Sequence, residues 1–136
     1  MNFVLDASVA AGWFLPDERS EYTEAVLDDV SGPSEALVPP LWFYEIHNVV
    51  LKGIRRGRVT VEVAAPLLTA LSQLRLRQRE TQYESIFNTA QRFGLSFYDA
   101  SYLDLAISRN LPLATTDNGL RDAARKAGVP LYRQDG

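Results

Sequence analysis

The segment Phe3-Val4-Leu5-Asp6-Ala7-Ser8 decides how this chain folds. Residues 2–5 form a short, largely apolar run that predicts a buried strand, and a helical pattern over 8–15 follows at once. An aspartate lies where the two elements meet. A carboxylate beside buried apolar segments is costly unless it is paired or binds a cation. The segment therefore predicts a strand-to-helix unit with a functional acid, Asp6, at its turn.

The same alternation of strands and helices continues to the end of the chain. Further strands are expected at 36–38, 75–79, 113–116 and 129–132, and further helices at 20–30, 41–56, 60–74, 83–93, 97–109 and 119–127. Strands alternating with helices are typical of a parallel sheet covered on both faces. We predict an α/β fold, a three-layer α/β/α sandwich with a mostly parallel sheet of about five strands, in a single domain spanning 1–136.

Composition narrows the class of protein. The 136 residues are 46% apolar and include no cysteine, which excludes a disulfide framework and any zinc site built from thiolates. This is compatible with a reducing cytoplasm, where we expect the protein. The apolar N-terminus has no basic flank and contains Asp6, so we expect neither a signal peptide nor a membrane span.

Four acidic residues stand where a buried-looking element begins or ends. In parallel sheets, ligands bind outside the carboxyl ends of the strands, and two of the four acids are expected there. If all four converge, they form an oxygen-rich site for a hard cation, which points to phosphodiester chemistry. The four are Asp6, Glu45, Asp99 and Asp117.

Each acid also has a purely structural interpretation. Asp6 and Asp117 are placed to cap helices, and Glu45 lies where a helix dipole favours an acid. Ser96 and Asp99 match a capping box. Asp104, five residues further on, is interpreted as a surface charge.

Basic residues gather in two short segments although the net charge is −3. Without the four candidate ligands, the charge becomes −3 + 4 = +1. The first segment is our candidate for contacts with an RNA backbone. It contains Lys52, Arg55, Arg56 and Arg58; the second contains Arg75, Arg77 and Arg79.

The sequence lacks the residues that several other classes of enzyme require. His47 is the only histidine, which weakens a zinc hydrolase or a Ser-His-Asp enzyme. No glycine-rich phosphate loop occurs. A haloacid-dehalogenase-like enzyme needs a second aspartate where Ser8 stands, and a receiver domain needs a lysine after a late strand, where none is found.

The ordered set of motifs resembles PIN-domain ribonucleases, and more closely the VapC-like toxins of toxin–antitoxin modules. The matching pieces are Asp6-Ala7-Ser8, then Tyr44-Glu45 with Asn48, then Tyr98-Asp99-Ala100, and last Leu113-Ala114-Thr115-Thr116-Asp117. Together they extend over essentially the whole chain. Each motif is weak alone, and the set in this order is fairly specific.

The resemblance implies a metal-dependent endoribonuclease that hydrolyses RNA phosphodiester bonds. Asp6, Glu45, Asp99 and Asp117 would bind Mg²⁺ or Mn²⁺. Ser8 and Thr115 would support them, and Asn48, one turn beyond Glu45, is placed to orient it. The family also implies a homodimer and inhibition by a cognate antitoxin protein.

The alternative is a PIN-like protein-binding module without catalysis. In that interpretation the acids are structural helix caps, and the helices at 8–15 and 41–51 form a groove for a partner. Aromatic anchors for the partner would include Trp13 and Tyr44.

Overall fold

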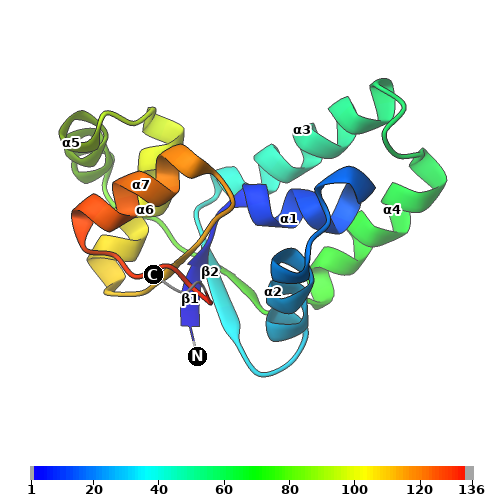
Figure 1. Ribbon diagram of the computed structural model, residues 1–136, viewed down its shortest axis with the longest axis horizontal. Helices are drawn as coiled ribbons and strands as arrows, with labels where there is room; N and C mark the ends of the chain where they lie inside the picture. The colour runs from blue at the N-terminus through cyan, green and yellow to red at the C-terminus, as the bar shows by residue number, and fades with distance from the viewer. Residues whose placement is uncertain (1, 134–136) are drawn as a thin grey trace.

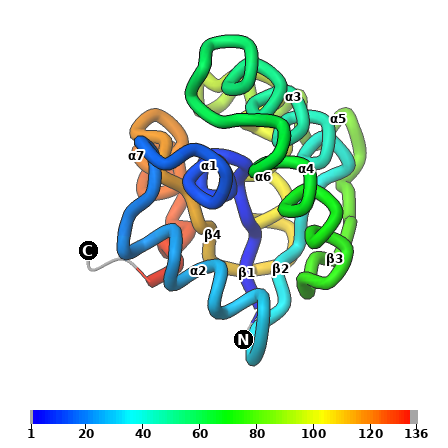
Figure 2. Tube along the Cα trace, turned by 90° about the vertical axis from the view of Figure 1, so that its right-hand side faces the viewer, coloured from blue at the N-terminus to red at the C-terminus, as the bar shows by residue number. Residues whose placement is uncertain are grey.

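The computed structural model describes residues 2–133, and its centre is a four-stranded parallel sheet. The strands lie in the order β3-β2-β1-β4, as Figure 2 shows, and every neighbouring pair is parallel. The strand expected at 129–132 does not form. In its place, Leu131 makes a single parallel bridge to Leu113 beside β4. The predicted parallel sheet is confirmed. Its strands are β1 (Asn2–Leu5), β2 (Glu35–Val38), β3 (Leu76–Gln78) and β4 (Leu113–Ala114).

Helices cover both faces of the sheet and complete the three predicted layers. In Figure 1, α1 to α4 lie on one side of β1 and β2, and α5 to α7 lie on the other. The helices are α1 (Ala7–Phe14), α2 (Glu21–Ser31), α3 (Leu41–Arg55), α4 (Val61–Ala70), α5 (Tyr83–Phe93), α6 (Phe97–Arg109) and α7 (Asn118–Ala127). Short 3-10 turns occupy Pro16–Glu18 and Leu71–Gln73.

Side-chain caps fix where several helices begin. Ser20 and Thr60 each accept a hydrogen bond from the backbone N–H three residues later, at the starts of α2 and α4. The helix expected over 60–74 ends earlier, at Ala70, and a 3-10 turn completes it. Pro66 lies inside α4 without ending it.

The core is densest around β1, because helices pack on both of its faces. Phe3, Val4 and Leu5 are fully buried, as are Trp42 on α3 and Tyr102 on α6. Among residues 2–133, no helix is both long and apolar enough to cross a membrane.

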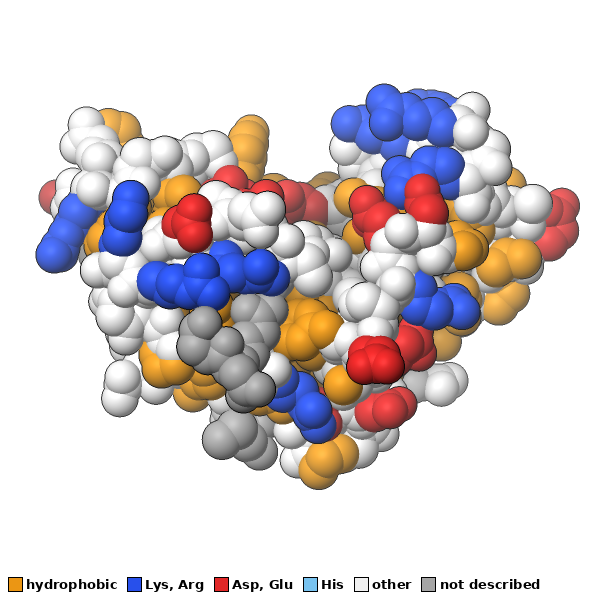
Figure 3. Space-filling model, viewed as in Figure 1, with side chains coloured by type: hydrophobic (Ala, Val, Ile, Leu, Met, Phe, Trp, Pro, Cys, Tyr) orange, Lys and Arg blue, Asp and Glu red, His pale blue; other side chains and the backbone are white. Residues whose placement is uncertain are grey.

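The two helical layers diverge beyond the carboxyl ends of the strands and leave a hollow between them. Figure 3 shows acidic side chains gathered in this hollow and Lys and Arg side chains crowding the far end of the α3–α4 layer. This hollow is therefore where the expected site residues meet.

Candidate active site

Asp6 is fixed at the junction of β1 and α1 by a network of hydroxyl groups. Its backbone N–H donates to the Ala114 carbonyl (2.9 Å), which brings Asp6 alongside Thr115. The Ser8 and Thr115 hydroxyls both donate to Asp6 Oδ2, at 2.6 and 2.8 Å. Asp6 precedes α1 but makes no side-chain capping bond. Its carboxylate is therefore held for another purpose than capping.

Backbone groups lock the two hydroxyls in turn. The N–H of Thr116 donates to Ser8 Oγ, and the N–H of Asp117 donates to Thr115 Oγ1, both at 3.0 Å. Because each hydroxyl accepts from the backbone, its own proton is directed to the Asp6 carboxylate. Ser8 and Thr115 thus hold the Asp6 carboxylate in place, and their role in supporting a metal ligand stays a prediction.

Burial makes the charge of Asp6 costly. The residue is 6% exposed, and burial raises the pKa of its carboxyl from 3.8 to about 6, against the hydrogen bonds from Ser8 and Thr115. The charges of Asp99 and Asp117 raise this pKa further. A group with these properties favours a nearby positive charge.

Glu45 lies in the second turn of α3 and is held from the opposite layer. The buried Tyr102 of α6 donates its phenol proton to Glu45 Oε1. Burial raises the pKa of Glu45, the bond from Tyr102 lowers it, and the charges of Asp6 and Asp99 raise it again. No local pattern in the sequence indicates this pair, because the two residues are 57 positions apart.

Asn48, expected to orient Glu45, does not do so. Its side chain is exposed on α3 and makes no hydrogen bond within residues 2–133. The orientation of Glu45 comes from Tyr102 instead.

Asp99 and Asp117 lie at helix starts; the Asp117 carboxylate is a cap, as its structural interpretation expects, whereas Asp99 contributes only its backbone N–H and completes no capping box. Ser96 caps α6 by accepting from the Asp99 N–H (3.0 Å), and Asp117 Oδ2 caps α7 by accepting from the Leu120 N–H (2.8 Å). Burial and the charge of Asp117 raise the pKa of Asp99. Capping and a place in the cluster therefore coexist.

The four acids form one electrostatic group that lacks a positive partner. Asp99 and Asp117 raise the pKa of Asp6, Asp6 and Asp99 raise that of Glu45, and Asp117 raises that of Asp99. None of the four forms an ion pair within residues 2–133. As the side chains stand, no three acidic or histidine residues in this range are grouped closely enough to hold a metal ion. The donor set itself, all carboxylate oxygen around a buried member, is what Mg²⁺ and Mn²⁺ prefer.

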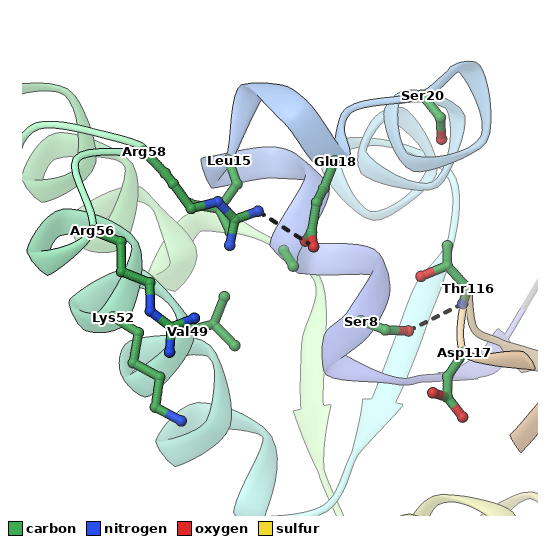
Figure 4. A pocket seen from close by; sticks show the side chains of 11 residues that line it. Ser8, Leu15, Glu18, Ser20, Val49, Lys52, Arg56, Arg58, Thr116 and Asp117 are labelled. Atoms are coloured by element: carbon green, nitrogen blue, oxygen red, sulfur yellow. Dashed lines mark hydrogen bonds and ion pairs between the residues drawn. The ribbon is translucent and has the colours of Figure 1, made fainter. Parts of the chain in front are cut away.

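A basic cleft of about 650 Å³ opens beside Asp117 (Figure 4). Ser8, Thr116 and Asp117 form one wall; Lys52 of α3 and Arg56, just after the end of that helix, extend toward it from the other. Arg58 also lines the cleft, but it is ion-paired with Asp17 and Glu18, at 3.0 and 3.5 Å. Arg55 is exposed and does not line it.

The expectation that Asp104 is a surface charge is wrong. Asp104 is 3% exposed and accepts hydrogen bonds from three hydroxyls, those of Thr81 (2.5 Å), Ser85 (3.0 Å) and Thr89 (2.7 Å). The three donors are spaced four residues apart in the sequence; Ser85 and Thr89 share one face of α5, and Thr81 lies just before the helix begins. That polar stripe was the signal in the sequence. Asp104 is a structural acid that fastens α5 to α6.

Comparison with known proteins agrees with this geometry. Residues 3–126 match the PIN domain family, and the chain belongs to that family. Over 126 residues, 90% of this chain and 94% of the relative, it is 32% identical to Ribonuclease VapC3 of Pyrobaculum aerophilum. The predicted resemblance is confirmed.

Two solved structures share the fold. PAE2754 from Pyrobaculum aerophilum superimposes with a TM-score of 0.71 at 26% identity, covering 90% of this chain and 84% of its own. VapBC2 from Rickettsia felis, solved bound to a DNA fragment from its promoter, gives 0.65 at 15% identity, covering 99% and 100%.

Proposed function

We propose that this protein is a metal-dependent endoribonuclease and the toxin of a toxin–antitoxin pair. The observation that carries the proposal is the buried Asp6 carboxylate, which is held by two hydroxyls, coupled to three more acids, and in no ion pair within residues 2–133. The basic cleft beside it supports a polyanionic substrate. The relative named Ribonuclease VapC3 supports RNA as that substrate.

Asp6, Glu45, Asp99 and Asp117 would hold Mg²⁺ or Mn²⁺. When bound, such a cation polarises the scissile phosphate and lowers the pKa of an attacking water. Two members of the set are held in place by hydrogen bonds. Ser8 and Thr115 restrain Asp6, and Tyr102 restrains Glu45. Asp117 is exposed and Asp99 half-buried, which leaves these two side chains room to adjust around an ion.

The substrate is single-stranded or locally unpaired RNA, since the readable features of RNA lie in unpaired bases. Lys52 and Arg56 bind its phosphates in the cleft next to Asp117. Arg58 contributes less, because Asp17 and Glu18 already neutralise its charge. Arg55 supplies only long-range attraction.

The partners follow from the same proposal. A small antitoxin protein, like the partner in VapBC2 of Rickettsia felis, inhibits the free enzyme in the cytoplasm. A second copy of the chain forms a homodimer. Tyr44 and Leu51, 79% and 43% exposed and two turns apart on α3, offer apolar surface for that contact.

A direct test uses purified protein with a linear and a circular single-stranded RNA, in Mg²⁺, Mn²⁺ or EDTA, beside Asp99→Asn. The proposal expects metal-dependent cutting of both RNAs, lost in the variant. Cutting of the linear strand alone would replace an endonuclease with an exonuclease. No cutting by folded, partner-free protein with either metal would contradict the proposal and favour the non-catalytic binding module.

A further inference from the structure

A second, apolar pocket is lined by residues of α3 and α6, the helices that carry Glu45 and Asp99. It is formed where the start of α3, the approach to α5 and the first turns of α6 meet, and its volume is about 230 Å³. Its lining consists of Pro39, Pro40, Leu41, Glu80, Thr81, Tyr83, Ile86, Phe97, Tyr98 and Ser101.

Two elements connect this pocket directly to the acids. Tyr98 in its wall immediately precedes Asp99, and Leu41 lies one helical turn before Glu45 on α3. Asp117, by contrast, lines the basic cleft. Two of the acids thus adjoin lining residues of the aromatic pocket along their helices, and a third lines the cleft that carries the cations.

Aromatic rings form the exposed rim of the pocket. Tyr83 is 74% exposed, Tyr98 62% and Phe97 41%. The rings of Tyr83 and Phe97 are 6.4 Å apart and tilted by 55°. Aromatic faces left open beside a nucleic-acid path are the usual surfaces on which unpaired bases stack.

The size of the pocket selects a small, flat occupant. A volume of about 230 Å³ is below the range of roughly 300–1,000 Å³ typical of pockets for drug-sized ligands. It does not admit a helix or a strand of a partner protein. A single nucleobase is a flat ring of the class that such a site accepts.

Apart from the phenols of Tyr83 and Tyr98, the polar side chains of the pocket are hydrogen-bond acceptors. The Thr81 hydroxyl donates its proton to Asp104, and the Ser101 hydroxyl donates its own to the Tyr98 carbonyl (2.6 Å). Each oxygen is then left to accept, and the Glu80 carboxylate accepts as well. These acceptors match a base with an exocyclic amino group, as guanine, adenine and cytosine have, better than uracil, whose only base-edge N–H donor is its ring N–H.

Resting on the proposed function, we propose that this pocket binds one unpaired, amino-bearing base of the RNA next to the phosphodiester that is cut. The base stacks on Tyr83 and Tyr98, and its amino group donates to Glu80. The neighbouring phosphates run past the acids into the cleft of Lys52 and Arg56. The pocket thereby sets which nucleotide flanks the cleaved bond.

The test measures binding of short single-stranded RNA to the Asp6→Asn protein, so that the RNA stays intact. Fluorescent strands carry an abasic site, or uridine in place of guanosine, moved along the sequence one position at a time. At one position, removal of the base weakens binding about tenfold or more, and uridine weakens it less. Tyr98→Ala abolishes that difference, Tyr98→Phe keeps it, and Glu80→Ala removes only the preference over uridine.

Phe87→Ala is the matched control, because Phe87 is an exposed ring one turn along α5 from Tyr83 and does not line the pocket. This variant is expected to keep the full difference in affinity between the intact and the abasic RNA strands. Retention of that difference in Tyr98→Ala would overturn the proposal. So would a halved mass of Tyr98→Ala in sedimentation with unchanged RNA affinity, which would assign the pocket to a second copy of the chain.

The binding and cleavage assays together also distinguish the base-binding pocket from the proposed nuclease function on which it rests. Base-dependent binding lost in Tyr98→Ala, in a protein that cuts no RNA, would support the pocket and contradict the nuclease. Metal-dependent cutting with base-independent binding would support the nuclease and contradict the pocket.

Discussion

The phenol of Tyr102 on α6 donates a hydrogen bond to the Glu45 carboxylate on α3. The two helices belong to opposite layers of the sandwich, so this bond spans the site above the carboxyl ends of the strands (Figure 1). Tyr102 is fully buried and cannot turn away. One oxygen of Glu45 is thereby fixed near Asp6, whose charge raises the pKa of Glu45.

Tyr102→Phe therefore weakens cation binding. The ring stays in its packed position, and only the donor to Glu45 is removed. Loss of a partner that orients a metal ligand typically costs 10- to 100-fold in affinity, and we expect about tenfold for Mn²⁺. Calorimetric titration of the metal-free protein with Mn²⁺ measures this without reference to cleavage.

Tyr132→Phe is the control for that experiment. Tyr132 is also buried and donates to a carboxylate, that of Asp29 (2.7 Å), which is none of the four acids. It is expected to lower stability while Mn²⁺ affinity stays constant. Equal Mn²⁺ affinities for Tyr102→Phe and the parent protein would contradict a positioning role for Tyr102.

The metal-free protein should lose stability as the pH rises through the range in which Asp6 ionises. Burial raises its pKa from 3.8 to about 6, so the folded protein binds this proton more tightly than the unfolded chain does. The resulting stabilisation is complete below pH 3.8 and is lost as the pH passes 6. The difference between a pKa of 3.8 and one of about 6 corresponds to a loss of about 3 kcal/mol in the free energy of unfolding. Urea unfolding in EDTA at a series of pH values measures it.

Asp6→Asn removes this dependence and is at least as stable as the parent above pH 6. The asparagine oxygen still accepts from Ser8 and Thr115, so the network survives. At neutral pH, added Mn²⁺ should raise the stability of the parent protein and leave the stability of Asp6→Asn unchanged. If the free energy of unfolding varied with pH in the same way in both proteins, the pKa of Asp6 would not be raised by burial as described.

The strands, the layers and the position of the four acids at the ends of elements were predictable from the sequence because they follow from local pattern, while the role of these acids as metal ligands stays a prediction. A buried strand ending in a carboxylate is visible in residues 2–6, and parallel strands bring such ends together wherever they occur in the chain. The cap at Asp117 was visible for the same reason. These are relations between neighbours in sequence or between equivalent ends of strands.

The partners of buried polar groups were not predictable in this way. Glu45 meets Tyr102 across 57 positions, and Asp104 meets Thr81 across 23. Such pairs depend on how two helices pack, which no local pattern fixes. Asn48 was chosen for Glu45 because it is close in sequence, although an exposed amide loses little by staying in water.

The roles of the basic residues in the cleft can be separated by salt dependence. We expect Lys52→Ala combined with Arg56→Ala to reduce the slope of log affinity for single-stranded RNA against log salt by about 0.7 for each phosphate that is no longer neutralised. Binding is measured with Asp6→Asn as background. Arg55→Ala, on the same helix but outside the cleft, should leave the slope unchanged. A larger reduction from Arg55→Ala than from the double variant would assign the RNA path to another face.

Asp104→Asn should destabilise the protein although it lies outside the acidic cluster. The substitution preserves size, so no cavity forms, but one acceptor oxygen becomes a donor and the charge that strengthens three hydroxyl bonds disappears. We expect a loss of about 2 kcal/mol in the free energy of unfolding by urea.

Because two of the three donors lie on α5, the loss should be local as well as global. Amide exchange in α5 should accelerate more than exchange in α1, which Asp104 does not touch. Asp122→Asn on α7 is the control, since Asp122 is exposed and pairs only with Arg125 at 3.6 Å. It should change stability by less than about 0.5 kcal/mol. Equal effects of the two substitutions would mean that the hydroxyl stripe of α5 is satisfied without Asp104.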